Sequence, residues 1–286
     1  MSATNEPVLL RQDEGRVAVL TLNRPQAMNA LSGELIDALQ AEFDRLAQDA
    51  EIRVVLIQAA GRGFCAGHDL REVRSTEEYA FFEDLVARCS RMMLAIRRLP
   101  QPVIAKVHGI ATAAGCQLVA ACDLAIASTD AKFATPGVNI GLFCGTPSVP
   151  LARNVAPKHA LDMLFTGDPI GAETALAYGL VSRVSPPESL AADAMRLAQH
   201  IASKSPLVLR MGKELYNRHS EMTLEQAYAY ASPVMAGGMM AQDARDGIDA
   251  FVKKQPRSTG WTPPKRPRRP AMTATPTPTC APSCRT

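Results

Sequence analysis

The 286-residue sequence contains no long hydrophobic run. No apolar stretch approaches the roughly 18 residues that a membrane-spanning helix needs. The longest stretches, such as VVLIQAA at 54–60, suit buried strands. The first residues, MSATNEPVLL, also lack the basic start and apolar centre of a secretory leader and the Arg-rich pattern of an import sequence. We therefore expect no membrane association and a cytoplasmic location.

The sequence also lacks a metal-binding or redox cysteine motif. Its seven cysteines form no CxxC pair, and no histidine stands near them at zinc-ligand spacing. They are Cys65, Cys89, Cys116, Cys122, Cys144, Cys280 and Cys284. We expect reduced thiols and no metal site. Cys144 is expected to be a buried structural thiol and not a nucleophile, because no histidine lies near it in the sequence.

The positive charge of the chain is concentrated at its C-terminal end. The formal net charge is +3, but residues 262–286 hold five basic residues and no acidic one, which leaves the remainder at −2. The body of the protein is therefore not a basic nucleic-acid binder, and we expect no nucleic-acid partner. The 262–286 segment also contains seven prolines and no apolar periodicity, which predicts a disordered tail.

Strand and helix patterns alternate over the first two thirds of the sequence, and helices dominate the last third. Strands are expected at 8–12, 17–22, 54–60, 102–109, 123–128 and 181–185. Helices are expected at 33–49, 76–98, from about 113, and at 157–166, 172–179, 189–203, 206–219, 223–235 and 240–254. Segment 133–147 is too rich in Gly and Pro for regular structure. The order predicts an α/β core followed by a C-terminal helical region.

Two segments could present free backbone N–H groups to a ligand. The loop FCAGHD at 64–69 contains Gly67, which allows an unusual turn, and a helix follows it. The helix that begins near Ala113 has only small residues from Thr112 to Gly115, so a ligand could reach its unpaired N–H groups. Two such groups aimed at one oxygen form an oxyanion hole, which stabilises an enolate or a tetrahedral intermediate. Close packing of the small residues is the alternative explanation.

Five segments carry a family resemblance. They are LNRPQAMNALS (22–32), VVLIQAAGRGFCAGHDL (54–70), PVIAKVHGIATAAGCQLVAACDLAIAS (102–128), FATPGVNIGL (133–142) and DGIDAFVKKQPRSTGW (246–261). In this order they resemble the enoyl-CoA hydratase/isomerase (crotonase) superfamily, from about residue 7 to Trp261. The GHDL and FATPGVNIGLFC stretches resemble one branch of that superfamily in particular.

This resemblance implies a ββα spiral core over residues 1–200, a C-terminal helical trimerisation region over 201–261 and the tail at 262–286. It implies an acyl-CoA substrate, with coenzyme A as part of that substrate and no permanently bound cofactor, and a homotrimer or a dimer of trimers. It places the oxyanion hole at the backbone N–H groups of His68 and Ala114. The implied CoA-binding residues are Gln26, Ala27, Met28, His68, Asp69, Leu70, Arg71 and Ala114. From the sequence itself, Asp69 is expected to cap the following helix.

Two positions depart from the family's hydratases, which use two glutamates to hold water and move its proton. Gln117 and Gly137 stand at these positions. An amide does not titrate and glycine has no side chain, while general acid–base groups contribute typically about 10²–10⁴-fold to a rate. We therefore expect weak hydration at most.

Several functions remain open at this point. The chain could be an enzyme that uses the backbone oxyanion hole on a CoA-thioester enolate with an altered acid–base set. It could also be an acyl-CoA decarboxylase or another lyase that uses the His68 imidazole, which titrates near neutral pH. A non-catalytic acyl-CoA-binding or regulatory protein, which kept the pocket and lost the chemistry, is the third possibility.

Overall fold

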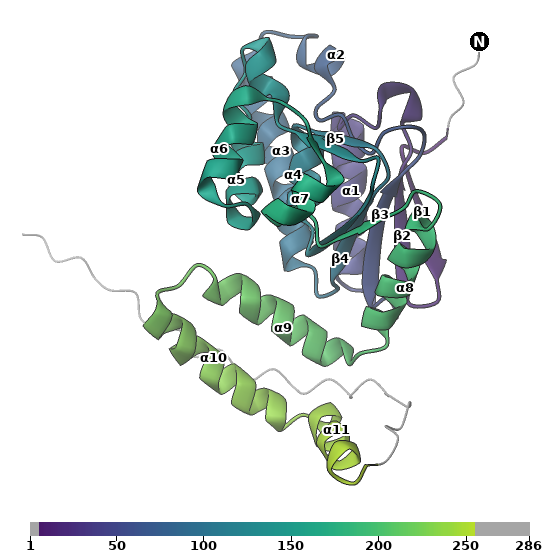
Figure 1. The fold of residues 1–286 in the computed structure, drawn as a ribbon, viewed down its shortest axis with the longest axis vertical. Coiled ribbons are helices and arrows are strands. Elements are labelled where there is room, and N and C mark those ends of the chain that lie inside the picture. Colours follow the sequence, from purple (N-terminus) through teal and green to yellow (C-terminus); the bar gives the residue numbers. More distant parts are fainter. Residues whose placement is uncertain (1–5, 255–286) are drawn as a thin grey trace, which may run out of the picture. The chain divides into compact units, whose positions relative to one another are not determined.

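The computed structural model describes residues 6–254, and the expected tail at 262–286 lies outside them. Figure 1 shows the arrangement of its elements. The strands are β1 (Leu9–Glu14), β2 (Val17–Leu22), β3 (Val54–Ala59), β4 (Val103–Val107), β5 (Ile110–Thr112), β6 (Leu124–Ser128), β7 (Lys132–Ala134), β8 (Ile170–Gly171) and β9 (Arg183–Ser185). The chain divides into two compact units, Met1–Ala241 and Gln242–Thr286.

The first unit contains the helices expected from the sequence and also α5 (Gly145–Asn154), which was not expected. The α-helices are α1 (Gly33–Leu46), α2 (Leu70–Val73), α3 (Tyr79–Arg98), α4 (Ala114–Ala121), α5 (Gly145–Asn154), α6 (Pro157–Thr166), α7 (Ala172–Tyr178), α8 (Leu190–Ala202), α9 (Pro206–His219) and α10 (Leu224–Met239). Short 3₁₀ helices are η1 (Pro25–Ala27) and η2 (Pro136–Ile140). The second unit contains α11 (Gln242–Val252) among its described residues. No helix within residues 6–254 combines the length and apolar character needed to cross a membrane.

A six-stranded sheet in the order β1-β2-β3-β4-β6-β9 forms the centre of the first unit. The β1–β2 pair is antiparallel, and the other pairs are parallel. A smaller sheet in the order β5-β7-β8 lies where α4 begins. Because β5 ends at Thr112 and α4 starts at Ala114, this smaller sheet holds the N-terminus of α4 in place.

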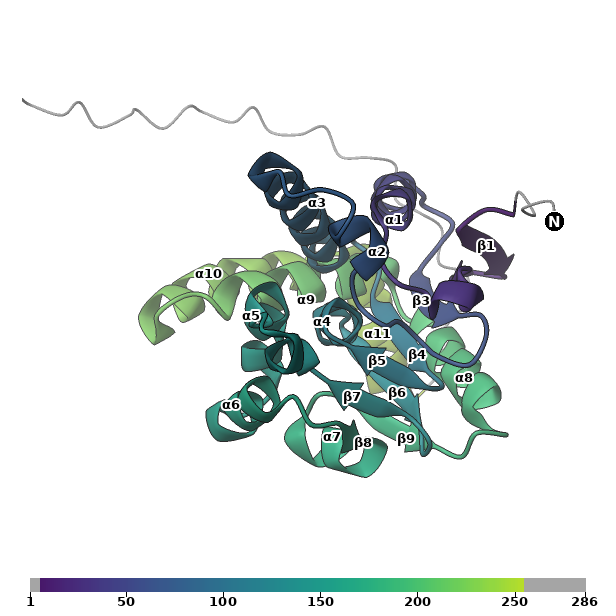
Figure 2. The same cartoon turned by 90° about the horizontal axis from the view of Figure 1, so that it is seen from above.

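The inner strands β2, β3 and β4 are buried on both faces, and their side chains alternate between two apolar clusters. Val17 and Val19 of β2 pack with α8 in one apolar cluster. Ala18, Leu20 and Leu22 of the same strand pack with α1, α3 and α4 in the other. Figure 2 shows α8 on the opposite side of the sheet from α1 and α3. Strands that are buried on both faces have continuous apolar sequences, and these runs allowed the strands to be predicted from the sequence.

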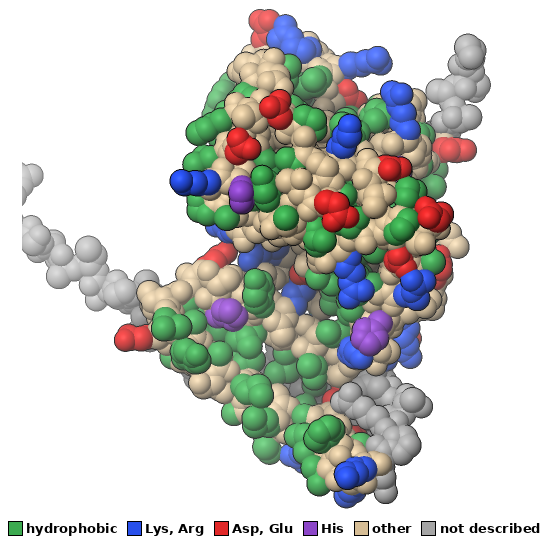
Figure 3. Space-filling model, viewed as in Figure 1, with side chains coloured by type: hydrophobic (Ala, Val, Ile, Leu, Met, Phe, Trp, Pro, Cys, Tyr) green, Lys and Arg blue, Asp and Glu red, His purple; other side chains and the backbone are tan. Residues whose placement is uncertain are grey.

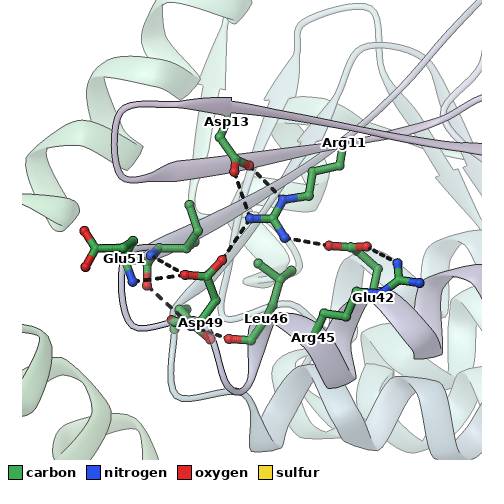
Figure 4. Close-up of polar contacts among 9 residues, drawn as sticks. Arg11, Asp13, Glu42, Arg45, Leu46, Asp49 and Glu51 are labelled. Carbon is green, nitrogen blue, oxygen red and sulfur yellow. Dashed lines mark hydrogen bonds and ion pairs between the residues drawn. The ribbon is translucent and has the colours of Figure 1, made fainter.

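Polar contacts fix the ends of several elements. The Ser32 side chain accepts a hydrogen bond from Leu35 N, so the expected start of α1 is confirmed. Arg11 of the edge strand β1 contacts Asp13 of the same strand, Glu42 of α1 and Asp49 of the turn after α1 (Figure 4). The Arg11–Glu42 contact is 2.9 Å long and the Glu42 side chain is buried. This network ties the edge strand β1 to α1 and to the turn that follows α1.

The expectation of irregular structure at 133–147 is wrong. The segment contains β7, η2 and the start of α5. Its prolines do not prevent this, because Pro136 opens η2 and Pro147 lies in the first turn of α5, where no intrahelical N–H is lost. The helix expected at 223–235 also runs further, to Met239, through Gly237 and Gly238.

Candidate functional site

The loop 64–69 lies directly beside β5 and the start of α4. Phe64 N donates to Ile110 O at 2.9 Å, and Thr112 N donates to Cys65 O at 2.9 Å. The Thr112 hydroxyl donates to Ala66 O at 3.1 Å. These bonds bring together the two segments that the sequence marks as sources of free N–H groups.

Glycine is required at the points of closest approach between the loop and α4. A Cβ on Gly67, whose φ is +93°, would lie 2.9 Å from Ala113 Cβ and 3.3 Å from Ala114 N. A Cβ on Gly115 would lie only 2.1 Å from Cys65 O. Gly115 therefore serves close packing, while Gly67 places the backbone of the loop next to the first N–H of α4.

Within residues 6–254, neither the His68 N–H nor the Ala114 N–H donates a hydrogen bond. Ala114 is the first residue of α4, and its N–H has no intrahelical acceptor. The preceding Ala113 adopts φ 50° and ψ −119°, a conformation that costs a non-glycine residue about 1–3 kcal/mol. Its own N–H donates to Ala134 O at 2.9 Å, so β7 contributes to holding this strained turn.

The His68 side chain is half-buried, and its Nδ1 is buried without a partner at hydrogen-bond geometry within the described residues. Desolvation lowers the pKa of the imidazole, and the nearby Leu31 carbonyl and Glu72 carboxylate oppose this shift only in part. The backbone on either side is fixed, because Leu31 N donates to Gly67 O at 2.7 Å and Asp69 N donates to Leu31 O at 3.2 Å. Burial of the ring thus favours the neutral form of the His68 imidazole.

Asp69 caps α2, as expected, and also holds an ion pair. Its Oδ1 accepts a hydrogen bond from Arg71 N at 3.1 Å, and its Oδ2 accepts one from Arg24 at 2.8 Å. Arg24 also donates to Ala30 O at 2.6 Å. The hydrogen bond from the Arg24 guanidinium lowers the pKa of the Asp69 carboxyl. The pair thus anchors the loop immediately after His68.

The two groups of expected CoA-binding residues lie side by side. Ala66 N donates to Met28 O at 3.0 Å, which joins the segment Gln26–Met28 to the loop that leads to His68. Gln26, Leu70 and Arg71 are exposed at this edge of the molecule. Gln26 and Ala27 lie in η1, and Met28 follows it in a left-handed conformation.

Gln117 and Gly137 occupy different environments. The Gln117 side chain is 4% exposed, and its Oε1 has no hydrogen-bond partner within the described residues. A buried polar atom without a partner costs about 1–3 kcal/mol. Gly137 has no room for a side chain, because an added Cβ would lie 2.1 Å from Leu142 O and 2.9 Å from Cys144 Sγ.

A cavity of about 900 Å³ lies between α3, α4, α5 and α9, and Gln117 lines it. No pattern in the sequence indicated this cavity, or the role of Lys213 in holding α9 beside it. Lys213 Nζ donates to Asp123 Oδ2 at 2.6 Å, to Ile96 O at 2.8 Å and to Gln101 O at 2.9 Å. Thr146 of α5, which also lines the cavity, was not singled out either.

The described cysteines have the character of structural thiols. Burial raises the pKa of Cys65 and Cys116 to about 12. Cys144 is buried, its pKa is also raised by burial, and no disulfide joins the cysteines of residues 6–254. The expectation that Cys144 is a buried thiol is confirmed.

Comparison with known proteins identifies similar chains. The family profile described as enoyl-CoA hydratase/isomerase matches residues 12–262. The mouse protein named enoyl-CoA hydratase domain-containing protein 3, mitochondrial, is 43% identical over 245 residues, which cover 86% of this chain and 81% of that protein. A crystal structure of an enoyl-CoA hydratase from Mycobacterium smegmatis has a TM-score of 0.87 and 50% identity, covering 88% of this chain and 99% of that one.

A second solved structure, of human enoyl Coenzyme A hydratase domain-containing protein 3, has a TM-score of 0.85 and 41% identity, covering 88% of this chain and 99% of that one. These structural matches confirm the expected crotonase-like α/β fold with C-terminal helices. The cytoplasmic expectation is contradicted, because the mouse, frog and human relatives are all named as mitochondrial proteins.

Proposed function

Because the chain belongs to the enoyl-CoA hydratase/isomerase family, we propose that it binds an acyl-CoA thioester and stabilises the enolate of that thioester. The N–H groups of His68 and Ala114 form the proposed oxyanion hole. One observation carries this proposal: both N–H groups lack an acceptor within residues 6–254, and Gly67 places them next to each other. Two preorganised donors in a water-poor site stabilise developing negative charge strongly.

The surroundings of the proposed hole support an anionic oxygen. Ala114 stands at the N-terminus of α4, where the helix dipole favours negative charge. The Arg24–Asp69 pair fixes the loop that presents the His68 N–H, so the donors need little reorganisation when the substrate binds. The exposed segment around Gln26 and the residues Leu70 and Arg71 supply an edge for the CoA portion of the substrate.

Hydration is expected to be slow in this arrangement. Gln117 can hold a water molecule or a substrate oxygen, but its amide does not accept a proton at neutral pH. Gly137 offers no side chain, and the Leu142 carbonyl occupies the space that one would need. The second candidate function, acyl-CoA binding without turnover, is supported by this same steric closure.

Assembly into a homotrimer or a dimer of trimers is part of the proposal, with the helices of 201–261 as the contact region. Large apolar side chains on α10 are exposed in the single chain: Leu224, Tyr228, Met235 and Met239. Figure 3 shows hydrophobic side chains gathered over α10. Exposed apolar surface of this kind marks a contact with another protein surface.

Calorimetry with CoA thioesters and a hydration assay with crotonyl-CoA test the proposed function together. We expect acyl-CoA to bind, and the enoyl-thioester absorbance to decay at least about 100-fold more slowly than with an active hydratase of the family, because both carboxylates are missing. Failure to bind any CoA thioester would refute the proposal. A hydration rate within tenfold of the active enzyme would refute the role assigned to the missing glutamates.

A further inference from the structure

The side chain of Glu72, on the short helix α2, reaches the first residue of α1. Its Oε2 accepts a hydrogen bond from Gly33 N at 2.9 Å, and its Oε1 shares the same N–H at 3.2 Å. We infer that Glu72 is a positioning residue for the proposed oxyanion hole: by fastening α2 to α1, it keeps the His68 N–H aimed at the thioester oxygen. This inference rests on the proposed function, because it assumes that the His68 N–H is one of the two donors.

The direction of the His68 N–H is set by the peptide bond between Gly67 and His68. This bond is trans, and in a trans peptide the C=O and the N–H point in opposite directions. Leu31 N donates to Gly67 O at 2.7 Å, so the C=O points toward Leu31 and the His68 N–H points away from it. The next amide of the loop, Asp69 N, donates to Leu31 O at 3.2 Å. The backbone at Leu31 therefore orients the proposed donor.

Glu72 joins the same two segments a second time. On one segment, Gly33 lies two positions after Leu31. On the other, Glu72 lies four positions after His68. The helix α2 has only four residues, and a helix this short has little stability of its own. It therefore depends on side-chain anchors to keep its place, and Glu72 is the anchor that reaches α1.

The N-terminus of α1 suits a carboxylate. The first N–H groups of a helix have no partner within it, and the helix dipole favours negative charge there. The Ser32 side chain accepts a hydrogen bond from Leu35 N, so Ser32 and Glu72 each satisfy one of these N–H groups. Arg88 of α3 reaches the same point, because an added Cβ on Gly33 would lie 2.7 Å from Arg88 Nη2 and 2.9 Å from Glu72 Oε1. Figure 2 shows α2 next to α1 and α3.

This crowding makes Gly33→Ala a test that separates position from stability. The three atoms nearest to the added Cβ all belong to the side chains of Arg88 and Glu72, which can swing aside. Gly33 is the first residue of a helix and has no positive φ, and alanine is a better helix former than glycine. The variant should therefore unfold at the same urea concentration as the wild type or a higher one, although the Glu72 carboxylate is displaced from Gly33 N.

The experiment is infrared spectroscopy of the full chain saturated with acetyl-CoA whose thioester carbonyl carries an isotope label. Saturation ensures that weaker binding does not by itself change the signal. In the wild type, the two N–H donors should lower the carbonyl frequency below that of the free thioester. Glu72→Met and Gly33→Ala should each reduce this shift by about half, because one of the two donors turns away from the oxygen. Glu72→Gln should keep most of the shift, because its amide oxygen can still accept from Gly33 N.

Glu34→Met is the matched control. Glu34 is exposed in the first turn of the same helix, and its side chain makes no hydrogen bond or ion pair within residues 6–254. Its replacement changes the charge at this helix terminus as much as Glu72→Met does, but it leaves the anchor between α1 and α2 in place. The carbonyl shift should therefore stay at its wild-type value.

Each outcome decides the inference. A wild-type shift that survives in both Glu72→Met and Gly33→Ala would overturn it and leave the proposed function standing. An equal reduction in Glu34→Met and Glu72→Met would also overturn it, because charge at the helix terminus would then be the cause. If Glu72→Met does not fold, the result for Gly33→Ala alone decides. If the wild-type chain shows no shift, the proposed function fails first and the inference fails with it.

Discussion

Replacement of Gly137 by alanine tests whether this position is sterically closed. An added Cβ would lie 2.1 Å from Leu142 O and 2.9 Å from Cys144 Sγ. The nearer atom belongs to the backbone, and it cannot move without the turn that Leu142 N closes onto Gly137 O at 2.9 Å. Overpacking of this kind costs about 1–3 kcal/mol. At roughly 2–4 °C per kcal/mol for a chain of this size class, the melting temperature should fall by several degrees.

Gly145→Ala is the control for this prediction. Gly145 begins α5, eight positions along the chain, and an added Cβ there would meet nothing within 4 Å. Its free energy of unfolding should stay within about 0.5 kcal/mol of the wild type. Both variants should be compared by urea unfolding at one protein concentration, because assembly would make the stability depend on concentration. If Gly137→Ala unfolds at the same urea concentration as Gly145→Ala, the steric argument is wrong.

This prediction bears directly on catalysis. If the position rejects even a methyl group, a glutamate introduced at Gly137 would have to displace the backbone near Leu142. Restoring the two carboxylates would then require a rearranged loop and not merely two substitutions. The backbone around Gly137 thus leaves no space for the side chain of a second glutamate.

Three further outcomes are expected from other parts of the structure. Lys213→Met should lower the free energy of unfolding by an amount at the low end of roughly 3–5 kcal/mol, because it leaves Asp123, whose side chain is 24% exposed, without its cation. In urea unfolding, the double variant with Asp123→Asn should recover part of this loss. A loss no greater than that of an average surface substitution would contradict the prediction. Because the pKa of His68 is lowered in the folded chain, the unfolded chain binds a proton at a higher pH than the folded chain does. The free energy of unfolding should therefore fall as the pH drops below about 6.5. His68→Gln should make the free energy of unfolding less dependent on pH between pH 7 and 5. Arg24→Met removes the hydrogen bond between Arg24 and Asp69 and should increase the mobility of the loop that carries His68. In calorimetry, acyl-CoA binding should weaken more than the binding of free CoA. Equal losses for both ligands would indicate a general structural effect instead.

The sequence predicted most of the fold because its signals are local. The apolar run of β2 and the Ser32 cap of α1 each depend on a few neighbouring residues. The prediction of irregular structure at 133–147 was wrong because proline disrupts the interior of a helix but is tolerated in its first turn, where Pro136 and Pro147 lie. Gly67 in the loop and the small residues at the start of α4 likewise marked the two segments, while the assignment of the donors to His68 and Ala114 came from the family resemblance.

Other parts of the candidate site depend on contacts between distant segments. Lys213 and Asp123 are separated by 90 positions, so nothing in either neighbourhood predicts their ion pair or the cavity beside it. The closure around Gly137 arises from a carbonyl five residues further on and from a turn whose shape was not predictable. The lowered pKa of His68 results from burial, which depends on the tertiary packing of the loop. The missing glutamates, by contrast, were identified by the resemblance of the sequence to the hydratases of the family.

Infrared spectroscopy of a bound thioester tests the central claim most directly. An isotope-labelled thioester carbonyl should absorb at lower frequency when it is bound than when it is free, because hydrogen bonds from His68 N–H and Ala114 N–H polarise the C=O bond. Gly67→Ala, whose Cβ would lie 2.9 Å from Ala113 Cβ, should reduce this shift by spreading the two donors apart. A bound carbonyl that absorbs at the same frequency as the free thioester would contradict the account.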